Sequence, residues 1–152
     1  MIKDSGNRTE FSTGAVRDVQ EGKGRCDLLP LDVAAYMFDD ERKEVLQNIC
    51  SFVRSADIVY LRQAVLEFCK REGWSIEQMI LEVAIHFEEG AKKYGERNWE
   101  KGIPISRYID SGVRHALKHF RRDDDERHDR AFCWNMLCAM WTCNHKPDLV
   151  DI

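Results

Sequence analysis

The segment AFCWNMLCAMW, residues 131–141, constrains the fold more than any other part of this chain. On a helix it is apolar on almost every side, with Asn135 as its one polar residue. A helix of that kind has to be buried, either at the centre of a bundle or against a partner subunit. It is far shorter than the roughly 20 apolar residues that cross a bilayer. The segment therefore predicts the central helix of a bundle and leads us to expect a homo-oligomer.

Helical spacing and helix-end signals continue through most of the chain. Apolar residues recur at helical spacing over residues 39–51, 55–73, 75–95 and 106–120. Residues suited to begin these helices precede the runs, namely Asp39 or Asp40, Ser55, Ser75 and Ser106. Ser75 and Gln78 have the spacing of a capping box. No segment alternates as a strand does, so we predict an all-α helical bundle.

The first 25 residues differ from the rest in composition. They hold only six apolar side chains and four of the nine glycines. We expect residues 1–25 to be an extended or mobile arm and residues 26–152 to form a single all-α domain.

Charge and cysteine content exclude several function classes. The chain carries 23 Lys and Arg against 27 Asp and Glu, a net charge of −4, which argues against a nucleic acid polymer as partner. The N-terminus lacks the apolar core of a signal peptide, and no apolar run is long enough for a membrane. The six cysteines form no CxxC pair, which is typical of a reduced, cytoplasmic protein.

The helix over residues 75–95 carries a carboxylate in an apolar surround. The helical neighbours of Glu88 include Leu81, Ala84 and Ile85, and an inward carboxylate must be paired, protonated or bound to a cation. The alternative is an intrahelical pair with Lys92. Glu89 lies on a more polar stripe, where it either binds a cation or forms part of an exposed salt-bridged face.

Acidic residues also gather before the last helix. Glu126 and Asp129 have ExxD spacing, and Asp125 adjoins them, so these oxygens could clamp one hard cation such as Mg²⁺ or Mn²⁺. The alternative is that they complement the helix dipole. His128 and Asn135 share a stripe of the same helix, where Asn135 either faces a ligand or bonds a neighbouring backbone.

The loop EEGAKKYGERNW, residues 88–99, unites lysines with aromatic residues. Lys92 and Lys93 could hold phosphates, while Tyr94 or Trp99 could stack on a base. A structural turn anchored by the tryptophan is the alternative.

Three stretches resemble a known family: GKGRCDLLP at residues 22–30, EEGAKKYGERNWEKGIPISRYIDSGVRHALKHF at 88–120 and DDERHDRAFCWNMLCAMW at 124–141. They are similar to the dATP/dGTP diphosphohydrolases of phages and prophages, which resemble the MazG-like all-α nucleotide pyrophosphohydrolases. The resemblance covers a little under half of the chain. Residues 36–75 match none of it and are interpreted as a lineage-specific helical insert.

The resemblance implies Mg²⁺-dependent (or Mn²⁺-dependent) hydrolysis of a deoxynucleoside triphosphate to the monophosphate and pyrophosphate. It implies catalytic and metal-binding roles for Glu88 and Glu89, and further metal ligands among Asp125, Glu126 and Asp129. The implied substrate-binding residues are Lys92, Lys93, Tyr94, Asn98, Trp99, Arg114, His115, His128 and Asn135. One departure is that Ile85 stands where MazG-like proteins place the first acid of an ExxE motif.

Two other functions stay open at this point. An HD-type phosphohydrolase would combine His128 and Asp129 with His115 or His119 and with Asp148. A non-catalytic nucleotide-binding or structural helical module would keep the fold and need no metal.

Overall fold

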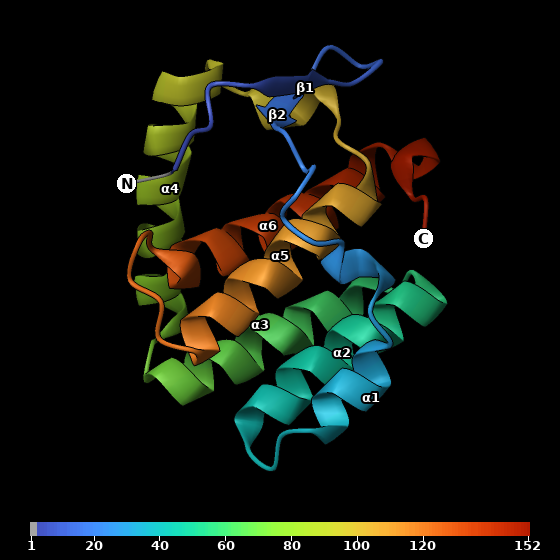
Figure 1. The fold of residues 1–152 in the computed structure, drawn as a ribbon, viewed down its shortest axis with the longest axis vertical. Helices are drawn as coiled ribbons and strands as arrows, with labels where there is room; N and C mark the ends of the chain where they lie inside the picture. The colour runs from blue at the N-terminus through green and yellow to red at the C-terminus, as the bar shows by residue number, and fades with distance from the viewer. Residues whose placement is uncertain (1–2) are drawn as a thin grey trace.

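The computed structural model describes residues 3–152, and over this range the chain is a helical bundle with one short hairpin (Figure 1). The prediction of an all-α bundle is confirmed. The helices are α1 (Leu31–Tyr36), α2 (Glu41–Ser55), α3 (Ile58–Glu72), α4 (Ile76–Tyr94), α5 (Ile105–Phe120) and α6 (His128–His145). Short 3₁₀ turns are η1 (Cys26–Leu28), η2 (Asn98–Lys101) and η3 (Pro147–Leu149). None of the helices in this range is long and apolar enough to cross a membrane.

The helix ends follow local capping chemistry. Asp40 caps α2 by accepting a hydrogen bond from the backbone N–H of Arg42, and Ser75 accepts one from Gln78 as predicted. The expected start of α3 at Ser55 is wrong. Ser55 is the last residue of α2, and Asp57 caps α3 after Ala56 takes a left-handed conformation with φ of 58°. A carboxylate closer to the helix start thus replaces the serine.

Helix α6 lies at the centre of the core, as its apolar sequence predicts. It packs against α3, α4 and α5, and Phe132, Met136 and Ala139 are fully buried. The rings of Phe132 and Phe68 are 4.7 Å apart, which ties α6 to α3. Gly112 lets α5 approach α6 closely, because a Cβ there would collide with Met136. All six cysteines are free thiols.

Helix α4 is rotated differently from the prediction. Met79 and Val83 are buried as expected, but the outward side of the helix carries a row of exposed apolar side chains: Ile76, Ile80, Leu81 and Ile85. The sequence shows two apolar stripes on α4, and only one of them faces α6. Within residues 3–152 the other faces outward.

A hairpin occupies the segment where the sequence predicted an extended or mobile arm. Strands β1 (Arg8–Glu10) and β2 (Val16–Asp18) pair antiparallel, with Thr9 opposite Arg17. The expectation that the chain has no strands is wrong, because three-residue strands are too short to show alternation. In Figure 1 the hairpin lies above α5 and α6, beside the end of α4.

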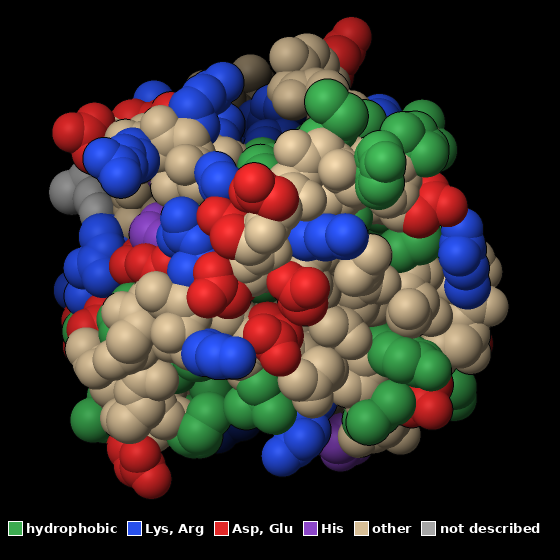
Figure 2. All heavy atoms as spheres, turned by 90° about the horizontal axis from the view of Figure 1, so that it is seen from below, with side chains coloured by type: hydrophobic (Ala, Val, Ile, Leu, Met, Phe, Trp, Pro, Cys, Tyr) green, Lys and Arg blue, Asp and Glu red, His purple; other side chains and the backbone are tan. Residues whose placement is uncertain are grey.

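The opposite end of the molecule shows acidic side chains gathered near its middle, with Lys and Arg around them (Figure 2).

Candidate functional site

A cavity of about 900 Å³ lies between the hairpin, α4, α5 and α6. Its lining includes six acidic side chains and eight basic ones, the latter being Lys3, Arg17, Lys23, Lys93, Arg97, Arg107, Arg114 and Lys118. The lining therefore has an excess of two positive charges, whereas the whole chain has a net charge of −4. Such a cavity suits an anionic ligand of nucleotide size.

A group of side chains that could hold a metal ion lies at one wall of this cavity. Residues 121–127 turn the chain from α5 into α6 and bring His128 beside His115. Ligand atoms of His115, Glu126 and His128 all lie within 4.8 Å of one another. A second group, Asp123, Asp125 and His128, meets the same criterion and shares one histidine. The structure thus brings together carboxylate and imidazole donors from two helices.

Hydrogen bonds fix the two imidazoles. His128 Nε2 lies 2.7 Å from Asp125 Oδ1, and His128 Nδ1 lies 2.9 Å from His115 Nδ1. If Nε2 of His128 donates to the carboxylate, its Nδ1 accepts from His115, and Nε2 of His115 keeps its lone pair. Burial, reinforced by the neighbouring His128, holds the pKa of His115 well below its usual range. His115 is therefore the neutral imidazole that metal binding requires.

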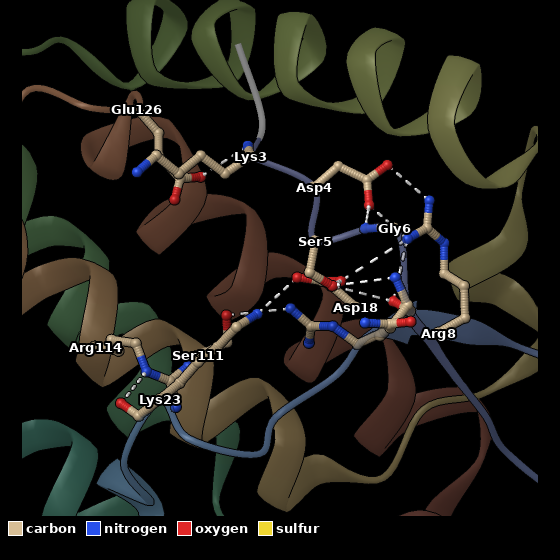
Figure 3. A network of polar contacts seen from close by, with 12 residues as sticks. Lys3, Asp4, Ser5, Gly6, Arg8, Asp18, Lys23, Ser111, Arg114 and Glu126 are labelled. Atoms are coloured by element: carbon tan, nitrogen blue, oxygen red, sulfur yellow. Dashed lines mark hydrogen bonds and ion pairs between the residues drawn. The ribbon is translucent and has the colours of Figure 1, made fainter.

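The N-terminal segment contacts the same carboxylates. The ammonium of Lys3 lies 2.9 Å from Asp125 Oδ2, and its backbone N–H lies 3.4 Å from Glu126 Oε1 (Figure 3). Lys3, followed by His128, lowers the pKa of Asp125 well below its usual range. A positive charge therefore already stands beside the donor group.

A second wall is formed by Arg17, Ser111 and Asn135. The Arg17 guanidinium donates to Ser111 Oγ at 3.1 Å and to Asn135 Oδ1 at 3.2 and 3.3 Å. Asn135 also donates from Nδ2 to the carbonyl of Ala131 at 2.8 Å. Asn135 thus lines the cavity, but its oxygen accepts from Arg17 and its amino group bonds the backbone of its own helix, not that of a neighbouring helix. Its predicted contact with a ligand stays a prediction.

The inward face of α4 adds a buried histidine to the cavity. His86 packs 5.4 Å from the Trp134 ring, and burial lowers its pKa to about 4. Nearby Arg17 and Arg130 lower the pKa further. The indole N–H of Trp134 has no hydrogen-bond partner among the described residues. Both side chains are neutral and polar, and either could contact a neutral part of a ligand.

Glu88 is exposed, which corrects the expectation of an inward carboxylate. Its side chain is 70% exposed at the rim of the cavity, and its carboxylate lies 4.0 Å from the ammonium of Lys92, whose side chain is 76% exposed. The apolar neighbours that suggested burial, such as Leu81 and Ile85, belong to the outward stripe of α4. The intrahelical alternative therefore describes the position of Glu88, and its catalytic role stays a prediction.

Two further predicted ligands also lie away from the donor group. Glu89 is half-buried and close enough to Arg127 to raise the pKa of that guanidinium. Asp129 pairs with the same arginine at 3.0 Å. Neither belongs to the two groups of donors found among residues 3–152. Their predicted metal binding has no support from the geometry.

The predicted substrate-binding residues divide into two sets. Lys93, Tyr94, Arg114 and His115 line the cavity, although Arg114 is already bound to Asp110 at 2.5 Å. Asn98 and Trp99 are also at the wall, where they hold the structure together. Asn98 bonds both the N–H and the carbonyl of Val16 at 2.8 Å, and Trp99 packs against Phe87 and Trp141.

The HD-type alternative needs residues that the structure keeps apart. His119 contacts Glu72 at 2.8 Å, Asp129 contacts Arg127, and Asp148 is exposed in η3. Only His115 and His128 of that set are neighbours. The geometry therefore does not support an HD-type centre.

Several residues at the site were not predicted, among them Asp110, His86 and Arg17. Asp110 is buried and accepts hydrogen bonds from Arg114, Gln20 and the N–H of Cys26, and its i,i+4 spacing to Arg114 was a usable signal. The inward position of His86 could be predicted only if the orientation of α4 about its own axis were known. Nothing local in the sequence marks Arg17.

Comparison with known proteins gives one match. A family model described as "dATP/dGTP diphosphohydrolase, N-terminal" matches residues 74–151, just over half of the chain. This stretch contains α4, α5 and α6 and therefore the whole histidine and carboxylate group, while the hairpin lies outside it. No curated protein and no solved structure matches the chain.

Proposed function

The chain belongs to the dATP/dGTP diphosphohydrolase family, and on this premise we propose that it hydrolyses a purine deoxynucleoside triphosphate, dATP or dGTP, to the monophosphate and pyrophosphate. The family name makes the protein a hydrolase of the diphosphohydrolase type. The observation that carries the finer proposal is the positively lined cavity of about 900 Å³ with donor residues at its wall. Its size lies within the range of ordinary ligand pockets.

We propose a divalent metal ion as the cofactor, held by His115, Glu126 and His128. These donors fit such an ion because they are clustered and because His115 is neutral, with the lone pair of its Nε2 free. Asp125 orients His128 as an outer partner, and Nδ1 of His128 would exchange its contact with His115 for the ion. The sequence suggested an oxygen-only site for Mg²⁺, whereas two of these three donors are imidazoles. Mixed nitrogen and oxygen donors suit Mn²⁺ better than Mg²⁺. When bound, the ion would neutralise phosphate charge and lower the pKa of a water molecule.

The residues of the chain supply the rest of the site. Lys93 has a pKa lowered by burial and lies in the cavity, where its ammonium can contact phosphate oxygens. Tyr94 and Trp134 provide aromatic surface for a base. Arg114 holds the segment at Lys23 and Gly24 through its bonds to both carbonyls, so its role is to shape the cavity.

One screen tests the reaction. Purified protein is incubated with Mg²⁺ or Mn²⁺ and a panel of nucleoside and deoxynucleoside triphosphates, and the products are identified by chromatography. We expect monophosphate and pyrophosphate from dATP or dGTP, and EDTA should abolish turnover. Release of inorganic triphosphate or of a single phosphate would contradict the proposal. Binding of nucleotide without any turnover would instead identify a non-catalytic nucleotide-binding module.

We also propose that the chain forms a homo-oligomer through the outward apolar stripe of α4. Ile76 with Ile80, and Leu81 with Ile85, make two exposed apolar pairs at i,i+4 spacing on that helix, and exposed apolar surface of this kind is typical of interfaces. Light scattering coupled to size-exclusion chromatography measures the mass directly, and a monomer at all concentrations would exclude this assembly.

A further inference from the structure

We propose that Arg17, on β2 of the N-terminal hairpin, binds the polyphosphate of the ligand in this cavity. The inference rests on the proposed function for the identity of the ligand. It adds a binding residue that lies outside the stretch matched by the family model, which begins at residue 74.

The first argument is position. Arg17 extends from β2 into the cavity and reaches α5 and α6 at once, through Ser111 and Asn135. Its guanidinium carbon lies 5.5 Å from the centres of both the Tyr108 and the Trp134 rings. The cation of β2 therefore stands among groups from two helices, α5 and α6, with aromatic surface on its flanks.

The second argument is charge. Both hydrogen-bond partners of Arg17 are neutral, and among residues 3–152 no carboxylate lies within ion-pair distance of its guanidinium. Two other arginines that contact the site differ in this respect, because Arg114 is paired with Asp110 and Arg8 with Asp4. Burial lowers the pKa of Arg17, yet a guanidinium stays protonated at neutral pH. Arg17 is half-buried at the cavity wall, and a partly desolvated cation without a protein anion favours an anionic ligand there.

The neighbouring acid cannot supply the missing charge. Asp18 follows Arg17 on β2, and successive side chains of a strand point to opposite faces. Figure 3 shows Ser5, Arg8 and Lys23 converging on Asp18, with Lys23 Nζ at 2.8 Å and Arg8 Nη1 at 3.8 Å. That carboxylate is thus already surrounded by cations of its own.

The third argument is that the guanidinium is held in place. The side chain of Asn98 accepts a hydrogen bond from the N–H of Val16 and donates one to its carbonyl. Asn135 is itself bonded to the backbone of Ala131. Arg17 therefore meets a ligand without first having to be ordered. Its planar fork matches two oxygens of a phosphate, which a lysine ammonium cannot do. The excess of positive charge in the lining favours a ligand with several phosphates over a simple carboxylate.

The test measures binding of inorganic pyrophosphate to the full-length protein by calorimetry, in EDTA so that no metal takes part. Arg17→Gln should weaken this binding by about 30-fold, as expected for the loss of charge-assisted hydrogen bonds. Arg17→Lys should restore only part of the affinity. The control is Arg54→Gln. Arg54 is an exposed arginine of α2 that is paired with Asp32 of α1, and this variant should bind pyrophosphate like the wild type.

A second variant keeps the proposal testable should Arg17→Gln fail to fold. Asn135→Asp places a carboxylate at the oxygen that already accepts from Arg17, so it supplies the missing anion within the protein. The change also removes the Nδ2 donor to the Ala131 carbonyl, so we expect a folded variant with a lower melting temperature that has lost most of its affinity for pyrophosphate. Pyrophosphate should raise the melting temperature of the wild type and not that of the variant.

The outcomes separate this inference from the proposed reaction. Arg17→Gln or Asn135→Asp binding pyrophosphate as tightly as the wild type overturns it, and so does a wild type that binds no pyrophosphate in EDTA. Neither result bears on hydrolysis with metal present. Conversely, a protein that hydrolyses no nucleotide but loses pyrophosphate binding in both variants supports the role of Arg17 alone.

Discussion

The middle of α4 and the turn that leads into α6 each carry two neighbouring carboxylates, Glu88 with Glu89 and Asp125 with Glu126. On α4 they have lysine and arginine neighbours, and Glu88 is largely exposed. At the turn, by contrast, α5 contributes His115 and α6 contributes His128, so that donors of two kinds converge beside a cavity. A pair of acids becomes a candidate metal site where a second helix brings further donors to it.

The largest effect expected from this contrast is on turnover. Glu126→Gln should lower the rate of pyrophosphate release by about 100-fold or more, since even outer partners of a metal cost 10–100-fold. Glu88→Gln should cost about threefold or less, because its charge is screened by solvent at the rim. Initial rates at saturating Mn²⁺ measure both. Equal losses in the two variants would show that Glu88 contributes to turnover as much as Glu126 does. The two pairs of carboxylates would then not differ in function.

The second test asks which side of α4 faces inward. His86 and Glu88 lie about 200° apart on the helix, so they cannot both be buried. The pKa of His86 is about 4 in the folded protein and near 6.5 in the unfolded chain, so the unfolded chain binds more protons below pH 6.5. The free energy of unfolding should therefore fall by about 2 kcal/mol from pH 7 to pH 5 on account of His86.

Urea unfolding of the wild type and of His86→Phe at both pH values measures this loss. The variant should lose less stability on acidification than the wild type. An NMR titration that placed the His86 pKa near 6.5 would show that α4 turns its other side inward.

These two regions also show what the sequence could predict. The burial of α6 and the cap at Ser75 were predicted correctly because both depend on neighbouring residues. The rotation of α4 was not, because its Met79–Val83 pair and its Leu81–Ile85 pair are both apolar at helical spacing, and only packing against α6 selects one. The contact of Arg17 with Asn135 joins residues more than 100 positions apart, and no local pattern marks such a pair.

A smaller effect concerns the lysine beside each pair of acids. The ammonium of Lys3 stands beside Asp125 and repels a cation bound nearby, so Lys3→Ala should raise the affinity for Mn²⁺ by about two- to fivefold. Lys92→Ala, next to Glu88, is the matched control and should leave Mn²⁺ binding as it is. Calorimetric titration at low salt and again at high salt measures the change, which should shrink as salt screens it. The same gain in both variants would show that the effect is one of overall charge.

The smallest effect is expected for Leu81 on the outward side of α4, with buried Val83 as the contrast. Leu81→Lys should change the free energy of unfolding by no more than about 0.5 kcal/mol, because Leu81 is 69% exposed. Val83→Ala should cost about 2 kcal/mol, because Val83 is buried. Denaturant unfolding of dilute protein measures both. At high concentration, Leu81→Lys should also lower the mass of the proposed oligomer, and a large loss in dilute monomer would contradict the outward position of this residue.

The hairpin also determines how the wall of the cavity moves. Two strands of three residues are not stable alone in water, so the order of residues 8–18 depends on the hydrogen bonds of Asn98 to Val16 and on the bonds of Arg17. Opening of the segment would break these anchors together, so residues 8–18 should open as one cooperative unit. Its backbone amides should therefore exchange with deuterium together and sooner than those of α6, and a ligand bound to Arg17 should slow them as a group.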